Sequence, residues 1–385
     1  MQTTSTSMNP KFPAKRMLTW GRSKRYAMIL ISTCGMLLWT NFAVTGSTGG
    51  QALAAESNLG SSLRVVSQPI VIDGHSSEIQ SANVSGSTYI GLRMLIEKLG
   101  FTLVWNEEER TATISGHNRT LKMSIDSGQY IVNDNRIYGS STMLHEGSLF
   151  VPLRLIAEQM GYGVSYDAAT QKITIDAIKE NNLTIQTVKV AKEGSNQSSD
   201  IQYPQIAGLA DKAVQQKIND FLVSENQARI SAGLSAVKKA DEENAKIKAD
   251  NPTIIIPPST LESSYEVTYN EQNKLSLYSD YYLYTGGAHG TTSRRGYTFD
   301  LLTGEQVTLK EAARNQANYV SQINTIIKKQ ISDTGLFLLA PFETIEADRD
   351  YFLKHEGIVV YFNQYEYTAY AEGMPEFIIP FSSLK

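Results

Sequence analysis

The stretch FVPLRLIAEQMGYGVSYDAATQKITID, residues 150–176, repeats an earlier stretch, YIGLRMLIEKLGFTLVWNEEERTATIS, residues 89–115. The two align without a gap at an offset of 61 residues. Each copy predicts a short extended entry, an amphipathic helix, a glycine that ends the helix and a two-stranded hairpin. Because two copies are too few for an open solenoid, we expect them to close on each other as a pair.

The apolar positions of both copies recur at helical spacing and then alternate, as a helix followed by a strand requires. The helical positions are Leu92, Leu95, Ile96 and Leu99 in the first copy, and Leu153, Ile156, Ala157 and Met160 in the second. Gly100 and Gly161 occupy the matching helix ends. With the strands expected around and between the copies, residues 63–178 are predicted to form one pseudo-duplicated β-α-β-β domain of the α+β class.

The sequence beyond the repeat predicts a second α+β domain at residues 183–385, a mixed antiparallel sheet with packed helices. A polar run at residues 192–199 is typical of a solvated loop near the start of this domain. Residues 211–250 carry the longest helical pattern, in which Gly233 is a candidate break. A Thr-x-x-Glu capping box predicts another helix over residues 308–331.

Charge is unevenly distributed along the 385 residues. Six of the 35 basic residues precede Ala55 and no acidic residue does, which leaves 29 basic against all 39 acidic residues in the rest. The six are Lys11, Lys15, Arg16, Arg22, Lys24 and Arg25. Because phosphate binding needs a basic patch, this acidic balance argues against nucleic acid as a partner.

The basic run is followed by an apolar stretch at residues 27–44 and by Ala52-Leu53-Ala54, which has the A-x-A form of a signal-peptidase site. Residues 1–54 are therefore predicted to be an export signal, either cleaved after Ala54 or kept as an N-terminal membrane anchor. A lipid anchor on Cys34, the only cysteine, is a third option. A cleaved product has no thiol, which excludes disulfides and thiolate chemistry. We expect an extracytoplasmic protein, secreted or held at the outer face of the cytoplasmic membrane or cell wall.

The repeated pattern, with Pro-Leu-Arg, Ala-Glu, Gly and aromatic-Asp in the second copy, resembles the N-terminal domain of copper amine oxidases. This resemblance implies a non-catalytic stalk or surface-binding module, common on proteins exported by Gram-positive bacteria. Amine oxidase activity is not implied, because the only Asn-Tyr pair, Asn318-Tyr319, is followed by Val320 and no His-x-His pair occurs. The histidines are His75, His117, His145, His289 and His355. We expect no cofactor and no metal site.

A glycine-rich loop with one histidine, GGAHG at residues 286–290, follows an aromatic strand predicted at residues 275–285. Glycines let backbone approach a ligand closely, and an imidazole can donate a hydrogen bond or titrate. The loop is not a phosphate loop, because no Gly-Lys-Ser/Thr follows. The alternative is a wide turn in which His289 packs locally.

A series of tyrosines accompanies this loop in the aromatic strand and in the C-terminal segment. They are Tyr278, Tyr281, Tyr282, Tyr284, Tyr361, Tyr365, Tyr367 and Tyr370. Aromatic faces with polar tips suit sugar rings or a protein interface, and they suit cross-strand packing equally well. Because strand side chains alternate, at least half of these tyrosines should lie in the core. The candidate ligand-binding residues are Gly286, Gly287, His289, Tyr282, Tyr284 and Tyr365.

The GGAHG loop, YTFDLLTG at residues 297–304 and the closing segment at residues 361–382 together resemble a second known module. This is the extracellular domain of the lysozyme-sensing anti-sigma factors for sigma V, which also precedes the catalytic domain in some peptidoglycan deacetylases. The resemblance spans residues 183–385 and implies a binding domain, with lysozyme as the ligand of the anti-sigma version. Because the N-terminal portion is short and basic and the sequence ends at Lys385, we expect neither a sigma-factor-binding domain nor a deacetylase domain.

These features predict an exported, envelope-associated, non-catalytic binding protein whose repeat domain holds or spaces the C-terminal module near the wall. The expected partner is cell-wall glycan or a secreted protein such as lysozyme, with the membrane involved only through the N-terminal segment. One alternative is a lysozyme-binding sensor or inhibitor. Another is a hydrolase of peptidoglycan, with Asp300, Glu305 or Glu376 as acid and base, which requires two carboxylates about 5 to 10 Å apart.

Overall fold

The computed structural model describes residues 63–384, apart from residues 168–169 and 191–198. Its strands form four sheets with interspersed helices, so the predicted α+β class is confirmed. The predicted export segment, residues 1–54, lies outside the described residues. Within the described part, no helix combines the length and the apolar character needed to cross a membrane.

A seven-stranded sheet joins the two copies of the repeat through their entry strands. Strand β3 of the first copy pairs antiparallel with β10 of the second, and this pairing places Ile90 opposite Val151. Both side chains are fully buried, so the contact between the copies is part of the core. In spatial order the strands are β11 (Tyr162–Asp167), β12 (Lys172–Ala177), β1 (Val66–Ile72), β2 (His75–Val84), β3 (Ser87–Gly91), β10 (Ser148–Pro152) and β9 (Met143–His145).

Both copies have the predicted order of strand, helix and hairpin, so the duplication is confirmed. Helix α1 (Leu92–Leu99) follows β3 and helix α2 (Leu153–Gln159) follows β10. The two hairpins then join different sheets, because β12 pairs in parallel with β1 whereas the first hairpin continues into a separate five-stranded sheet. The strands of that sheet are β4 (Thr102–Asn106), β5 (Thr111–Gly116), β6 (Arg119–Ser124), β7 (Gln129–Val132) and β8 (Asn135–Tyr138).

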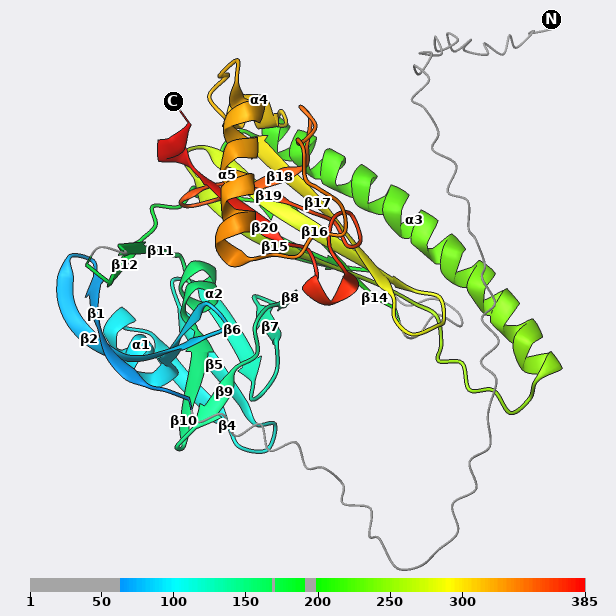
Figure 1. Cartoon of the computed structure of the whole chain (residues 1–385), viewed down its shortest axis with the longest axis horizontal. Helices are drawn as coiled ribbons and strands as arrows, with labels where there is room; N and C mark the ends of the chain where they lie inside the picture. The colour runs from blue at the N-terminus through cyan, green and yellow to red at the C-terminus, as the bar shows by residue number, and fades with distance from the viewer. Residues whose placement is uncertain (1–62, 168–169, 191–198, 385) are drawn as a thin grey trace, which may run out of the picture. The chain divides into compact units, whose positions relative to one another are not determined.

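The second region is built on another five-stranded sheet, covered on one face by the long helix α3 (Lys212–Asp250), as Figure 1 shows. Ile218 and Leu222 of α3 pack with Leu275 and Leu277 in one buried cluster. Asp211 caps the helix by accepting hydrogen bonds from two backbone amides of the first turn. The strands are β13 (Thr184–Lys189), β14 (Asp200–Ala207), β15 (Thr260–Glu271), β16 (Lys274–Tyr284) and β17 (Thr291–Asp300).

The opposite face of this sheet packs against a three-stranded sheet, which α5 covers on its outer side. Phe352 and Tyr361 of the smaller sheet contact Tyr278 of β16, while Ile323 and Ile327 of α5 pack on the other face. Two sheets and two helices therefore stack as four layers. The remaining elements are β18 (Tyr351–Lys354), β19 (Gly357–Tyr361), β20 (Glu376–Pro380), α4 (Leu309–Ala312), α5 (Tyr319–Thr334), η1 (Tyr370–Glu372) and η2 (Phe381–Ser383).

Two helix predictions were wrong in detail. Helix α3 is not broken at Gly233, because this glycine lets the helix approach β15: a Cβ at this position would lie 2.7 Å from a methyl carbon of Leu261. The predicted helix over residues 308–331 is two helices, since Arg314 and Asn315 adopt left-handed backbone angles that end α4. The capping box itself is present at Thr308.

Leu95 and Ile156 occupy matching positions in the two copies, and both are fully buried. Leu95→Ala and Ile156→Ala should each lower the free energy of unfolding by about 2–5 kcal/mol, measured by urea denaturation. Glu97→Ala, at an exposed position of α1, should change it by less than about 0.5 kcal/mol. A cost below about 1 kcal/mol at either core position would show that the two copies are not equivalently packed.

Candidate functional site

The candidate ligand-binding residues come together at one end of the second region. The hydroxyl of Tyr365 lies 3.0 Å from His289 Nε2, and the His289 ring stacks on Tyr370 with 3.9 Å between ring centroids. We call the group His289, Tyr365 and Tyr370 the His289 surface. Two of its residues were among the predicted ones, whereas Tyr370 belonged only to the wider tyrosine series.

The hydrogen bonds of His289 define how its ring is held. Its Nδ1 lies 3.0 Å from the carbonyl oxygen of Gly290, and a carbonyl can only accept. In the neutral ring, Nδ1 therefore carries the proton and Nε2 accepts from the Tyr365 hydroxyl. The ring is oriented on both sides before any ligand arrives.

The loop and the tyrosines of β16 support this surface. Gly286 and Gly287 have φ angles of 108° and 97°, in a region of backbone conformation that residues other than glycine rarely adopt. The Tyr284 hydroxyl donates to the carbonyl of Gly287 at 3.0 Å, and the amide of Gly290 donates to the Tyr282 hydroxyl at 3.3 Å. All six predicted residues are thus near one another, although their role in binding stays a prediction.

The tyrosine series divides between core and surface. Tyr281 is buried against α3, where its hydroxyl donates to Asn226 Oδ1 at 2.7 Å, and Tyr361 is fully buried between the sheets. Tyr365, in contrast, is 49% exposed and has a left-handed backbone with φ of 63°. A tyrosine held in this unfavourable conformation marks a position where the surrounding structure imposes strain, which is common at functional sites.

A second feature is a charged contact between the repeat domain and the second region. We call it the seam and define it by Arg154, Gln159, Glu266, Lys354 and Glu356. Arg154 pairs with Glu356 at 2.5 Å, and Gln159 donates to Glu266 at 2.8 Å. On the side of the second region the seam continues through Glu376, which lies 3.6 Å from Lys354 and 2.6 Å from Arg294.

Arg294 stabilises the side of the seam that belongs to the second region. Two of its nitrogens each donate to Asp280 at 2.8 Å, and its guanidinium lies 3.7 Å from the ring centroid of Tyr278. The Tyr278 hydroxyl in turn donates to Glu266 at 2.5 Å. Buried charges are tolerated only when they are paired and hydrogen-bonded, so this chain of contacts fixes the side chains on both sides of the seam.

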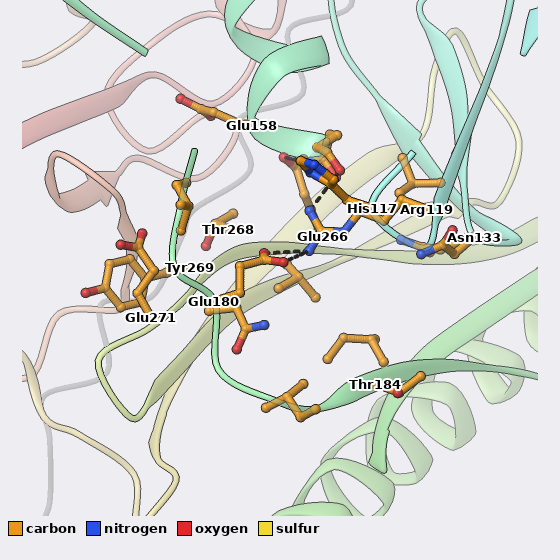
Figure 2. Close-up of a pocket in the computed structure, with 18 of the residues that line it drawn as sticks. His117, Arg119, Asn133, Glu158, Glu180, Thr184, Glu266, Thr268, Tyr269 and Glu271 are labelled. Atoms are coloured by element: carbon orange, nitrogen blue, oxygen red, sulfur yellow. Dashed lines mark hydrogen bonds and ion pairs between the residues drawn. The ribbon is translucent and has the colours of Figure 1, made fainter. Parts of the chain in front are cut away.

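A cavity of about 370 Å³ lies beside the seam, and Figure 2 shows its lining. Arg119, at the start of β6, pairs with both carboxylate oxygens of Glu180 at 2.5 and 2.7 Å. On the wall formed by the second region, His355 Nδ1 lies 2.9 Å from a carboxylate oxygen of Glu271. We call this cavity the seam pocket. None of these residues was predicted as a site, because the repeat domain and the second region supply them from distant parts of the sequence.

Three titratable residues that line the seam pocket have pKa values that are shifted by burial or by pairing. Burial raises the pKa of Glu158 and of Glu266 above the usual value for glutamate. The hydrogen bond that His355 donates to the Glu271 carboxylate raises the pKa of His355 above its usual value of 6.5. In all three cases the folded state holds its proton more tightly than the unfolded state does.

The carboxylates considered for glycan hydrolysis have separate structural roles. Asp300 accepts a hydrogen bond from the backbone amide of Leu302 at 2.8 Å, and Glu305 pairs with Lys217. Glu376 is engaged by Arg294 and Lys354. Among the described residues, no three His, Asp or Glu side chains are grouped as a metal site requires.

Three known domain families match the chain. Residues 71–175 and 136–202 match the copper amine oxidase N-terminal domain, residues 190–292 match the deacetylase PdaC, and residues 310–382 match a family of unknown function, DUF3298. The chain is also similar to the anti-sigma-V factor RsiV of Bacillus subtilis (strain 168), with 23% identity over 229 residues. That alignment covers 56% of this chain and 74% of RsiV.

Two solved structures of DUF3298 family proteins are similar to part of the chain. One, from Bacteroides fragilis, has 16% identity and a TM-score of 0.42, and the alignment covers 53% of this chain and 93% of that protein. The other, from Pseudomonas aeruginosa, has 13% identity and a TM-score of 0.35, with 53% and 94% covered.

The matches define a chain of several domains that are found in cell-envelope proteins. It carries copper amine oxidase N-terminal, PdaC and DUF3298 domains, and it is a distant homologue of the anti-sigma-V factor RsiV. Both resemblances expected from the sequence are therefore confirmed.

The raised pKa of His355 predicts a pH dependence of stability. Its contribution is fully present below the unfolded pKa of about 6.5 and is lost as the pH rises through the higher folded pKa. The urea midpoint should therefore be lower at a pH of about 8.5 than at about 5.5, and His355→Gln should reduce this difference. The raised pKa values of Glu158 and Glu266 also lower the stability of the folded protein as the pH rises, and this loss begins above a pH of about 4.5.

The matched control is His75→Gln, at an exposed position of β2 away from the seam. This variant should keep the pH dependence of the unsubstituted protein. An unchanged pH dependence in His355→Gln would contradict the assigned contribution of the contact between His355 and Glu271.

Proposed function

We propose that this chain is an exported, envelope-associated binding protein without catalytic activity. In this proposal the repeat domain at residues 63–178 holds or spaces the second region near the cell wall, and residues 183–385 bind the ligand. The observation that carries the proposal is the His289 surface, where an exposed, strained tyrosine is hydrogen-bonded to a histidine that stacks on a second tyrosine.

The chemistry of this surface favours binding. Tyrosine and histidine present flat apolar faces with polar edges, which suit a sugar ring or a protein surface. The Tyr365–His289–Tyr370 group is ordered by its own contacts. The protein therefore loses little conformational entropy when a ligand binds. The glycines beside it let a partner approach the backbone closely.

Two other observations support the envelope location. Residues 1–54 have the basic, apolar and A-x-A pattern of an export segment. The matched domains are ones found in cell-envelope proteins. Cell-wall glycan and secreted proteins are the ligands available there.

A second candidate function is lysozyme sensing or inhibition, favoured by the similarity to the anti-sigma-V factor RsiV over 229 residues. It requires a protein partner on the His289 surface. A stable complex with lysozyme in gel filtration supports it, whereas lysozyme activity that is unchanged by a molar excess of this protein excludes the inhibitor form.

The proposal predicts that the purified protein is retained on peptidoglycan or on immobilised lysozyme. His289→Ala and Tyr365→Ala should each weaken this retention by about tenfold or more, because aromatic anchors at the centre of an interface contribute on the order of 2 kcal/mol. The measurement is a pull-down with titrated ligand. Retention on neither material would exclude this version of the proposal.

The matched control is Tyr166→Ala, which removes an exposed tyrosine of β11 outside the His289 surface. Retention should be unchanged in this variant. Equal losses in Tyr166→Ala and Tyr365→Ala would mean that binding reports general exposure of aromatic side chains rather than the His289 surface.

A further inference from the structure

The seam pocket is a built cavity between two parts of the chain. From the repeat domain, Asn118 and Asn133 line it at the β5–β6 and β7–β8 turns. From the second region, Asn182, Thr184 and Tyr269 line it. Its volume of about 370 Å³ lies within the range of about 300–1,000 Å³ that small-molecule sites occupy.

The charged groups of the lining are already paired with one another. Arg119 is held by Glu180, and His355 is held by Glu271. Glu266 accepts hydrogen bonds from Gln159 and from Tyr278. An anionic ligand would meet several carboxylates, and a cationic ligand would have to displace an existing partner.

What the lining offers a ligand is neutral polar chemistry. Asn133 uses its Oδ1 to accept from the backbone amide of Thr120, which leaves its two N–H donors. Asn135 is 6% exposed and donates to the carbonyl of Tyr265, while its Oδ1 has no hydrogen-bond partner among the described residues. A buried acceptor without a hydrogen bond destabilises the folded protein by about 1–3 kcal/mol. A ligand that donates a hydrogen bond to Asn135 Oδ1 would remove this cost.

The aromatic rings add apolar area to this polar wall. Tyr265 and Tyr269 of β15 are both buried and both line the pocket. Burial raises the pKa of each to about 12, so both hydroxyls remain neutral. Amide groups, hydroxyls and tyrosine rings are together the groups that recognise polyhydroxylated molecules, which present many donors and acceptors beside C–H faces.

We propose that the seam pocket binds a neutral, hydroxyl-rich ligand, one or two units of a glycan, between the repeat domain and the second region. The site is separate from the His289 surface, so either can fail without the other. Because both parts of the chain supply its walls, a bound glycan stabilises their contact as well as the fold.

The test is calorimetric titration of the purified protein with the β-1,4-linked trimer of N-acetylglucosamine, which is neutral, and with its deacetylated form, which is cationic. The neutral trimer should bind, and Asn182→Ala combined with Thr184→Ala should weaken it by about tenfold or more, since two hydrogen-bonding groups are lost. Both residues are exposed, so the fold should be retained.

The matched control is Gln186→Ala, an exposed polar position on the same strand outside the pocket, which should bind as the unsubstituted protein does. No binding of the neutral trimer at millimolar concentration overturns the proposal. Binding of the cationic trimer alone, with loss at high salt, overturns the assignment of a neutral ligand. Binding that is lost in His289→Ala but kept in the double variant places the glycan at the His289 surface instead.

Discussion

The paired charges of the seam are the constraint on which the relation between the two halves of the described chain depends. Arg154 and Gln159 of the repeat domain contact Glu356 and Glu266 of the second region, and Tyr278, whose ring lies beside the Arg294 guanidinium, holds Glu266 in place. Arg294 is nearly buried, and because a charge removed from water must be paired in good geometry, its contacts with Asp280 and Glu376 fix the side of the seam that belongs to the second region. The seam pocket is lined by Gln159 and Glu266, so its walls depend on these contacts.

The duplication shows how one motif serves two purposes. Arg93 and Glu97 of the first copy are exposed, whereas their equivalents Arg154 and Glu158 pair with each other, and Arg154 also pairs with Glu356 across the seam. The apolar positions face the repeat core in both copies, as the fully buried Leu95 and Ile156 show. A repeated sequence therefore specifies its own core twice, and the second helix also contacts the second region through Arg154 and Gln159.

The two candidate binding places share a principle of construction. Each combines side chains from segments that are distant in sequence, and each is held by internal hydrogen bonds before a ligand arrives. At the His289 surface the preformed group is a histidine between two tyrosines. At the seam pocket, Arg119 with Glu180 and His355 with Glu271 neutralise the charges. The first suits a broad partner surface, while the second suits a small neutral molecule.

The sequence by itself determined the α+β class, the duplicated unit, the helix caps at Gly100 and Thr308 and the neighbourhood of His289, because these depend on periodicity, capping residues and glycines that act locally. The helix break predicted at Gly233 was wrong, because the role of this glycine depends on its contact with Leu261 of β15. Only the tertiary structure decided that Tyr370 stacks on His289 and that Arg154 meets Glu356, a residue 202 positions away. Such contacts arise from how sheets and helices pack, and packing between distant segments leaves no periodic signal in the chain.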